Sequence, residues 1–257
     1  MKNMGATERV IEGLPDETQK LLQTYVKEVK EVFGDHLEGL LLYGSAVRGE
    51  FLRGRSNLNI LLLVSSCDST VLKQYSALHR RWSKEQIVVP LFLTEEELRM
   101  SVAVFPLEFK EIQEYHRVLD GRDPFIGLHV KTDRLREAVV QGLTSHIVRL
   151  RQRYVEGGGT DEATTILLPL SITSTIPLLR GVRRLLGRPP LSHSDAVISD
   201  VGEQLNLDLQ GLLDAWLLKR GQISPGPREV PRLFDRYLQA TILVTRAVEQ
   251  LPQLEPR

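Results

Sequence analysis

The sequence is poor in cysteine, with Cys67 alone among 257 residues, so no disulfide can form within the chain. A chain without disulfides fits a reducing compartment, and we expect a cytoplasmic protein. The start, "MKNMGATERVIEGLPDE", is mixed and charged, unlike the apolar core of a signal peptide. The longest weakly polar run, "ATTILLPLSITSTIPLL", carries two prolines and several hydroxyl groups. No membrane association is therefore expected.

Charge of one sign is also lacking, since 33 basic residues balance 33 acidic ones. Aromatic residues make up 6% of the chain, and no basic strip alternates with them as in single-stranded nucleic-acid sites. Nucleic acid is therefore not indicated as a partner, and any anion binding must come from local clusters. The hydrophobic share of 42% is ordinary for a globular protein, and the length allows two domains.

Hydrophobic periodicity divides the chain near residue 125. Before that point, strands alternate with helices; after it, the pattern is almost entirely helical. Thr94 and Glu97 have the spacing of a capping box that begins a helix. We expect an α/β (α+β) domain over residues 1–125 and an all-α helical bundle over 126–257. The first domain is predicted to contain helices at 16–33 and 69–84, and strands at 37–44, 58–65 and 86–93.

The segment 41–64, "LLYGSAVRGEFLRGRSNLNILLLV", joins two apolar strands through a Gly-Ser turn. A strand that ends at Gly44 and Ser45 can present backbone N–H groups and a hydroxyl to phosphate oxygens. Arg48 and Arg55 add positive charge nearby, which makes these four residues the candidates for nucleotide binding. The alternative is an ordinary tight turn with solvated arginines.

The spacing of this segment resembles the signature of the DNA polymerase β-like nucleotidyltransferase superfamily, whose small members read Gly-Ser-x-Ala-Arg-Gly-Asp and then Ser-Asp-apolar-Asp. The resemblance is specific over about 25 residues and extends over 16–98. It implies a mixed sheet with flanking helices, a nucleoside triphosphate and two magnesium ions. The helical half resembles, more loosely, the bundles that follow such domains in aminoglycoside-modifying enzymes. The matching residues here are Gly44, Ser45, Arg48, Gly49 and Ser56, with Glu50 in the acidic place.

The departures fall on the metal ligands that the resemblance implies. Asn57 and Asn59 stand where the family has aspartates, and the strand expected to supply a third acid has only apolar residues over 87–93. Glu85 lies just before that strand. Two divalent ions about 4 Å apart repel by on the order of 15 kcal/mol at an effective dielectric near 20, and amides cannot offset this. We therefore predict a catalytically degenerate protein in which no residue is assigned a catalytic role and no cofactor is required.

Three functional hypotheses follow from these residues and from the resemblance. The first is a degenerate transferase that binds a nucleotide or acts as a regulatory partner. The second is an active enzyme that passes a nucleoside monophosphate to a small molecule, a protein or RNA. It would need magnesium held by relocated acids, with Glu50, Glu108 and Glu111 as candidates. The third is a protein-interaction module of a toxin–antitoxin-like pair, or a homodimer.

The arginines of 178–188, "LLRGVRRLLGR", either face phosphate or form a solvated helix side.

Overall fold

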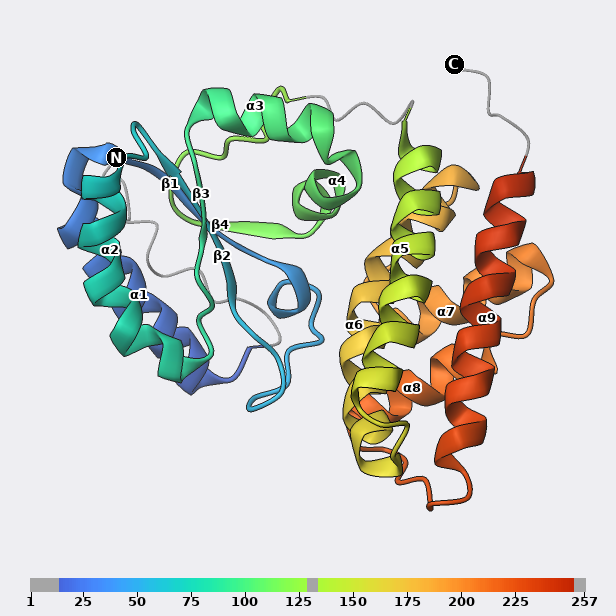
Figure 1. Ribbon diagram of the computed structural model, residues 1–257. Helices are drawn as coiled ribbons and strands as arrows, with labels where there is room; N and C mark the ends of the chain where they lie inside the picture. The colour runs from blue at the N-terminus through green and yellow to red at the C-terminus, as the bar shows by residue number, and fades with distance from the viewer. Residues whose placement is uncertain (1–13, 129–133, 252–257) are drawn as a thin grey trace. The chain divides into compact units, whose positions relative to one another are not determined.

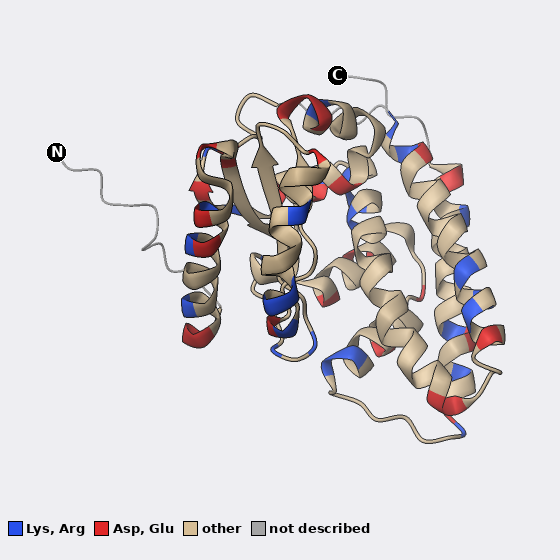
Figure 2. Ribbon diagram, turned by 60° about the vertical axis from the view of Figure 1, so that its left-hand side comes forward, with Lys and Arg blue, Asp and Glu red and all other residues tan. Residues whose placement is uncertain are grey.

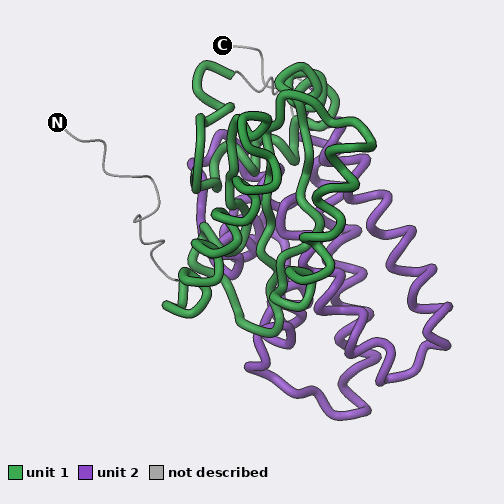
Figure 3. The backbone as a smooth tube through the Cα atoms, turned by 90° about the vertical axis from the view of Figure 1, so that its left-hand side faces the viewer, with its two compact units in different colours: residues 1–130 green, residues 131–257 purple. Residues whose placement is uncertain are grey.

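The computed structural model describes residues 14–128 and 134–251. The chain divides into two compact units, residues 1–130 and 131–257 (Figure 3). The sequence had placed the division between residues 125 and 126. Basic and acidic residues occur on the helices of both units (Figure 2), in keeping with the zero net charge.

The first unit contains a four-stranded mixed sheet in the order β3-β2-β1-β4 (Figure 1). The antiparallel pairs are β1 with β2 and β1 with β4, whereas β2 and β3 run parallel. This confirms the mixed sheet with flanking helices that was expected. The strands are β1 (Leu37–Tyr43), β2 (Asn59–Val64), β3 (Leu91–Leu93) and β4 (His116–Gly121).

Two helix pairs cover the two faces of this sheet. The face with Leu40, Leu42 and Leu62 packs on α1 (Asp16–Phe33) and α2 (Ser69–Trp82). The face with Leu41 and Leu61 packs on α3 (Glu95–Val104) and α4 (Pro106–Glu114). The leucines are fully buried, and each such side chain contributes roughly 1.5–3 kcal/mol. The double burial explains why β1 and β2 read as unbroken apolar runs.

Several helices and strands begin or end at the residues predicted from local sequence signals. The first helix has the predicted bounds, and Thr94 and Glu97 form the expected capping box. The third strand is shorter than predicted because Pro90 lacks an N–H donor, and β3 lies at the sheet edge. The sequence "VLDGRDPF" at 118–125 favours a short extended piece and a turn, and the strand β4 begins two residues earlier, at His116.

The second unit consists of α5 (Leu135–Glu156), α6 (Asp161–Leu185), α7 (Ser194–Leu205), α8 (Gln210–Arg220) and α9 (Val230–Gln250). The central helix is α6, which contacts each of the other four. This is the helical region that the sequence predicted, and glycines or prolines stand in the turns before α6, α7 and α9.

Among the described residues, α6 is the one helix long and apolar enough to cross a membrane by length and composition. Its most apolar 18-residue window is 61% buried in the unit. A core helix of a bundle passes the same test, and the position of α6 among four neighbours fits that role.

Candidate functional site

The Gly-Ser turn follows directly on β1, in the short helical turn Gly44–Ala46. Gly44 has a φ of +83°, a left-handed conformation that favours glycine. Its N–H donates to the carbonyl oxygen of Tyr115 at 3.2 Å. Its own carbonyl oxygen accepts the N–H groups of Val47 and Arg48 at 3.1 and 3.2 Å. The turn is therefore fixed to the residue between α4 and β4 and to its own helical continuation.

Asn59 lies beside this turn, whereas Asn57 lies in the preceding loop. In the β1–β2 register Asn59 is opposite Tyr43, the last residue before Gly44. An ideal Cβ built on Gly44 would stand 2.9 Å from Asn59 Nδ2. Asn59 is half-buried and Asn57 is exposed. The structure thus brings Asn59 to the turn and places an amide there.

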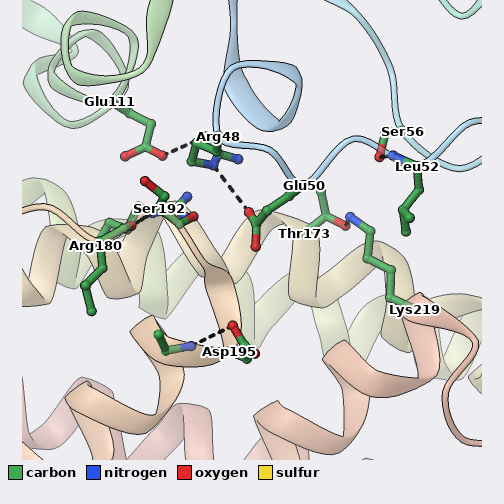
Figure 4. A network of polar contacts seen from close by, with 12 residues as sticks. Arg48, Glu50, Leu52, Ser56, Glu111, Thr173, Arg180, Ser192, Asp195 and Lys219 are labelled. Atoms are coloured by element: carbon green, nitrogen blue, oxygen red, sulfur yellow. Dashed lines mark hydrogen bonds and ion pairs between the residues drawn. The ribbon is translucent and has the colours of Figure 1, made fainter. Parts of the chain in front are cut away.

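The loop that carries Asn57 is closed by hydrogen bonds within the protein. Leu52 donates its N–H to Ser56 Oγ at 3.0 Å (Figure 4), and Ser56 donates its N–H to Leu52 O at 2.7 Å. Gln86 bridges the loop, because its Nε2 donates to Ser56 O at 2.7 Å and its Oε1 accepts from Gly54 N at 3.0 Å. These neutral contacts, together with the exposed ion pair of Arg53 and Glu17, position this loop.

Arg48 is the centre of a charged cluster at the turn (Figure 4). Its Nε lies 3.4 Å from Glu50 Oε2, and its Nη1 lies 3.1 Å from Glu111 Oε1. The guanidinium carbon also lies 5.5 Å from the ring centroid of Tyr115. The Arg48 side chain is 12% exposed. Arg48, a predicted phosphate ligand, is thus paired with Glu50 and Glu111, two of the candidate metal ligands.

The other predicted residues are dispersed around this cluster. Ser45 is half-buried, and its carbonyl oxygen accepts the Glu50 N–H at 3.0 Å. Arg55 is exposed on the loop. Glu108 is exposed on α4, one turn before Glu111, and Glu85 is exposed before β3. The structure therefore brings Glu50 and Glu111 to the turn, while Glu108 and Glu85 point to solvent.

The donor set beside Gly44 does not fit a pair of magnesium ions. The bridge between Leu58 and Ile87 and the pair Leu61–Leu91 place residues 88–90 beside the start of β2. These residues are Val, Val and Pro, so the adjacent strand offers no carboxylate. Within 14–128 and 134–251, no group of three His, Cys, Asp or Glu side chains could hold a metal. Magnesium prefers carboxylate and phosphate oxygens, which are missing at these positions.

The sequence did not indicate the pair that His116, at the start of β4, forms with Asp123, just after this strand. His116 Nδ1 lies 3.1 Å from the carbonyl oxygens of Ile112 and Gln113, and its Nε2 lies 3.2 Å from Asp123 Oδ2. His116 pairs with Tyr43 in the β1–β4 register, so the row Asn59–Tyr43–His116 crosses three strands. Asp123 follows β4 by two residues, and recognising β4 as a strand would have revealed this row.

Two arginines of the segment 178–188 make hydrogen bonds and an ion pair within the helical unit. Arg180 is buried and donates to the carbonyl oxygen of Ser192 at 2.7 Å (Figure 4). Arg183 is buried and donates to the carbonyl oxygen of Pro189 at 2.6 Å, and it pairs with Asp200. Both side chains hold the turn between α6 and α7. They form neither a solvated helix side nor a free phosphate site.

The mixed sheet with its Gly-Ser turn and flanking helices, followed by a helical region, is a nucleotidyltransferase-like α/β fold. The chain is similar to the crystal structure of spectinomycin adenyltransferase AAD(9) from Enterococcus faecialis with ATP and spectinomycin. The TM-score is 0.57 at 13% identity, over 88% of this chain and 98% of that chain. At this identity the similarity concerns the fold alone. No protein-family model and no curated protein sequence matches this chain.

Proposed function

We propose that this chain is a nucleotidyltransferase-fold protein that does not catalyse two-metal nucleotidyl transfer. The observation that carries the proposal is the amide of Asn59 beside Gly44, next to a strand without carboxylates. Asn57, two residues earlier, adds a second neutral side chain. Neutral oxygens cannot offset the repulsion between two divalent ions, so the site lacks the charge that this chemistry requires.

The role that fits such a protein is that of a cytoplasmic regulatory or partner subunit, with or without a bound nucleotide. The Gly44–Ser45 turn is preserved, which supports nucleotide binding. The outer sides of α5 and α6 expose Val148, Val155, Ile166 and Leu170. Exposed apolar side chains of this size favour contact with another protein or a second copy.

Isothermal titration with nucleoside triphosphates, with and without magnesium, tests the loss of metal chemistry. The expected result is that magnesium adds nothing to binding and that no pyrophosphate is released when candidate acceptors are supplied. Magnesium-dependent binding together with pyrophosphate release would reject the proposal.

Light scattering of wild type and of Ile166→Ser/Leu170→Ser tests the partner role. A concentration-independent monomer for wild type would argue against the homodimer.

An active transferase with relocated metal ligands is the second candidate, because Glu50 and Glu111 both lie at the turn. It would transfer a nucleoside monophosphate to a small molecule, a protein or RNA. The contacts of Glu50 and Glu111 with Arg48 argue against this candidate, because the guanidinium binds the carboxylate oxygens that a metal ion would need. If wild type shows turnover, loss of that turnover in Glu50→Gln and in Glu111→Gln would support this candidate.

A further inference from the structure

We infer that the surface along the contact between α5 and α6 docks an acidic amphipathic helix of another protein. This α5–α6 surface contains Arg149 and Arg153 on α5 and Ile166 and Leu170 on α6. The inference rests on the proposed role of this chain as a partner subunit, and it names the chemistry of the partner. The docked helix would carry carboxylates along one side and apolar side chains along the side next to it.

The register of the two helices places these four residues beside one another. The helices lie next to each other (Figure 1), and three pairs of residues mark their contact: Gly142 with Leu178, His146 with Thr175, and Gly157 with Ala163. The helices therefore run antiparallel. Arg149 and Arg153 follow His146 by three and seven residues, so they share the side of α5 that faces α6. Ile166 and Leu170 follow Ala163 in the same way on α6.

Electrostatics and exposure agree with this placement. Burial, followed by the charges of Arg153 and Arg149, lowers the pKa of His146, which contacts the Thr175 hydroxyl of α6 at 3.1 Å. Both guanidinium groups therefore act on the contact between the helices, and both arginines are exposed. Ile166 and Leu170 are 66% and 58% exposed. A helix that rests on this surface can reach two cations and two apolar side chains together.

The α5–α6 surface lacks negative charge. Residues 138–155 contain Arg149, Arg151 and Arg153 and no Asp or Glu, while residues 163–179 carry no charged side chain. Glu156 and Glu162 stand beside the turn that joins the two helices. Within the part of the chain that the structure describes, the three arginines form no ion pair. Arginine binds carboxylates through two parallel N–H bonds, so the complementary partner is acidic.

Charge also decides between this partner and other occupants. In a two-fold dimer the same surface meets itself, and the arginines of two copies would repel each other. An RNA backbone attracts arginines but has no apolar side chains to cover Ile166 and Leu170. Helices that lie in a membrane interface usually carry Trp or Phe anchors, and residues 138–155 and 163–179 contain neither. An acidic amphipathic helix matches the cations and the apolar side chains at once.

A labelled helical peptide of about four turns tests this surface. It carries glutamates along one side and leucines along the next, and a hydrocarbon staple keeps it helical. Fluorescence anisotropy should show saturable binding to wild type, and Arg149→Glu/Arg153→Glu should weaken that binding about tenfold or more. The same variant should instead bind the peptide in which lysines replace the glutamates. Ile166→Ser/Leu170→Ser should weaken binding of the acidic peptide as well.

Arg228→Glu/Arg246→Glu is the matched control, because it makes the same charge change at two exposed positions of the same unit. It should bind the acidic peptide as wild type does. Absence of binding by wild type, or an equal loss of affinity in the control, would overturn the inference. Arginine-dependent binding of RNA or of phosphatidylglycerol vesicles in place of the peptide would overturn it too.

A crosslink in the source cells tests the natural partner. Benzoylphenylalanine in place of Leu170 should crosslink to a segment of another protein in which Asp and Glu outnumber Lys and Arg, and Arg149→Glu/Arg153→Glu should abolish this crosslink. A crosslink to a second copy of this chain, or to a segment that is not acidic, would overturn the inference. Pyrophosphate release is scored separately. An active transferase that binds the peptide rejects only the functional proposal, whereas an inactive chain that does not bind it rejects only this inference.

Discussion

Gly44 and Asn59 are in such close contact that a Cβ on Gly44 would stand 2.9 Å from the Asn59 side-chain nitrogen. Gly44 stands in the turn just after β1, and Asn59 is the first residue of β2. Gly44 has a left-handed backbone with φ of +83°, and a side chain there would have to displace the end of the Asn59 side chain. This contact joins the turn to the position where the family resemblance implies a metal-binding aspartate.

Gly44→Ala should destabilise the first unit more than Gly49→Ala does. Both glycines have positive φ, which costs a residue with a Cβ roughly 1–2 kcal/mol. Only Gly44 adds an overlap, since nothing lies within 4 Å of a Cβ on Gly49. The overlap is with the end of the Asn59 side chain, which can shift, so it should add about 1 kcal/mol at most. Urea unfolding followed by Trp82 in a Trp216→Phe background measures the difference, and equal losses would show that the contact with Asn59 is not tight.

Asn57→Asp/Asn59→Asp should create a site for one divalent ion without restoring nucleotidyl transfer. A carboxylate beside the turn at position 59 and a second one two residues earlier in the loop can hold a single hard cation, whereas the adjacent strand still lacks a third. Manganese binding followed by electron paramagnetic resonance should give one ion per chain, and manganese should raise the melting temperature. Gln141→Glu/Gln204→Glu, at exposed helical positions, is the control for added charge. No binding by the double aspartate variant would mean that the turn is closed to cations.

Much of the fold was predictable because its signals are local. The bounds of α1, the capping box of Thr94 and Glu97, and the apolar strands β1 and β2 all depend on residues a few positions apart. The strand β4 was harder to anticipate, because its partly exposed residues lack an apolar run. Pro90 shortened β3 to three residues, which the edge position allows.

The site was predictable only in outline. The spacing of Gly44, Ser45 and Asn59 indicated that Asn59 lies near the Gly44–Ser45 turn, and the structure brings these residues together. The pairing of Arg48 with Glu111 joins positions 63 apart and follows from where α4 packs. Periodicity and composition carry no information on such a contact. The same reason applies to Arg183, whose pairing with Asp200 depends on the packing of α7.

Asp200→Ala should destabilise the helical unit strongly, by about 3–5 kcal/mol. Arg183 is 3% exposed, and removal of Asp200 leaves its charge buried without a carboxylate. Arg188→Ala is the control, because Arg188 is 44% exposed and also contacts Asp200 at 3.5 Å. Its loss should cost at most about 1 kcal/mol. Chemical denaturation followed by Trp216 in a Trp82→Phe background compares them; similar losses would show that Arg183 finds sufficient partners in its carbonyl contacts.

The helical unit should lose stability as the pH falls from about 6.5 toward 4 because His146 is buried. Its Nε2 lies 3.0 Å from the Tyr237 hydroxyl and 3.1 Å from the Thr175 hydroxyl. Burial, followed by the charges of Arg153 and Arg149, lowers the pKa of His146 to about 4. In the unfolded chain the histidine pKa is near 6.5, so in this interval the unfolded state binds more protons, and stability rises with pH.

The shift of the His146 pKa corresponds to an upper value of about 3 kcal/mol between pH 6.5 and 4. Urea unfolding at several pH values, followed by Trp216 in the Trp82→Phe background, should show this slope in the otherwise unchanged chain. His146→Gln should flatten it, since glutamine keeps a polar side chain and does not titrate. His36→Gln, at an exposed position of the first unit, should leave the slope as it was. A slope that survives His146→Gln would assign the pH dependence to other groups.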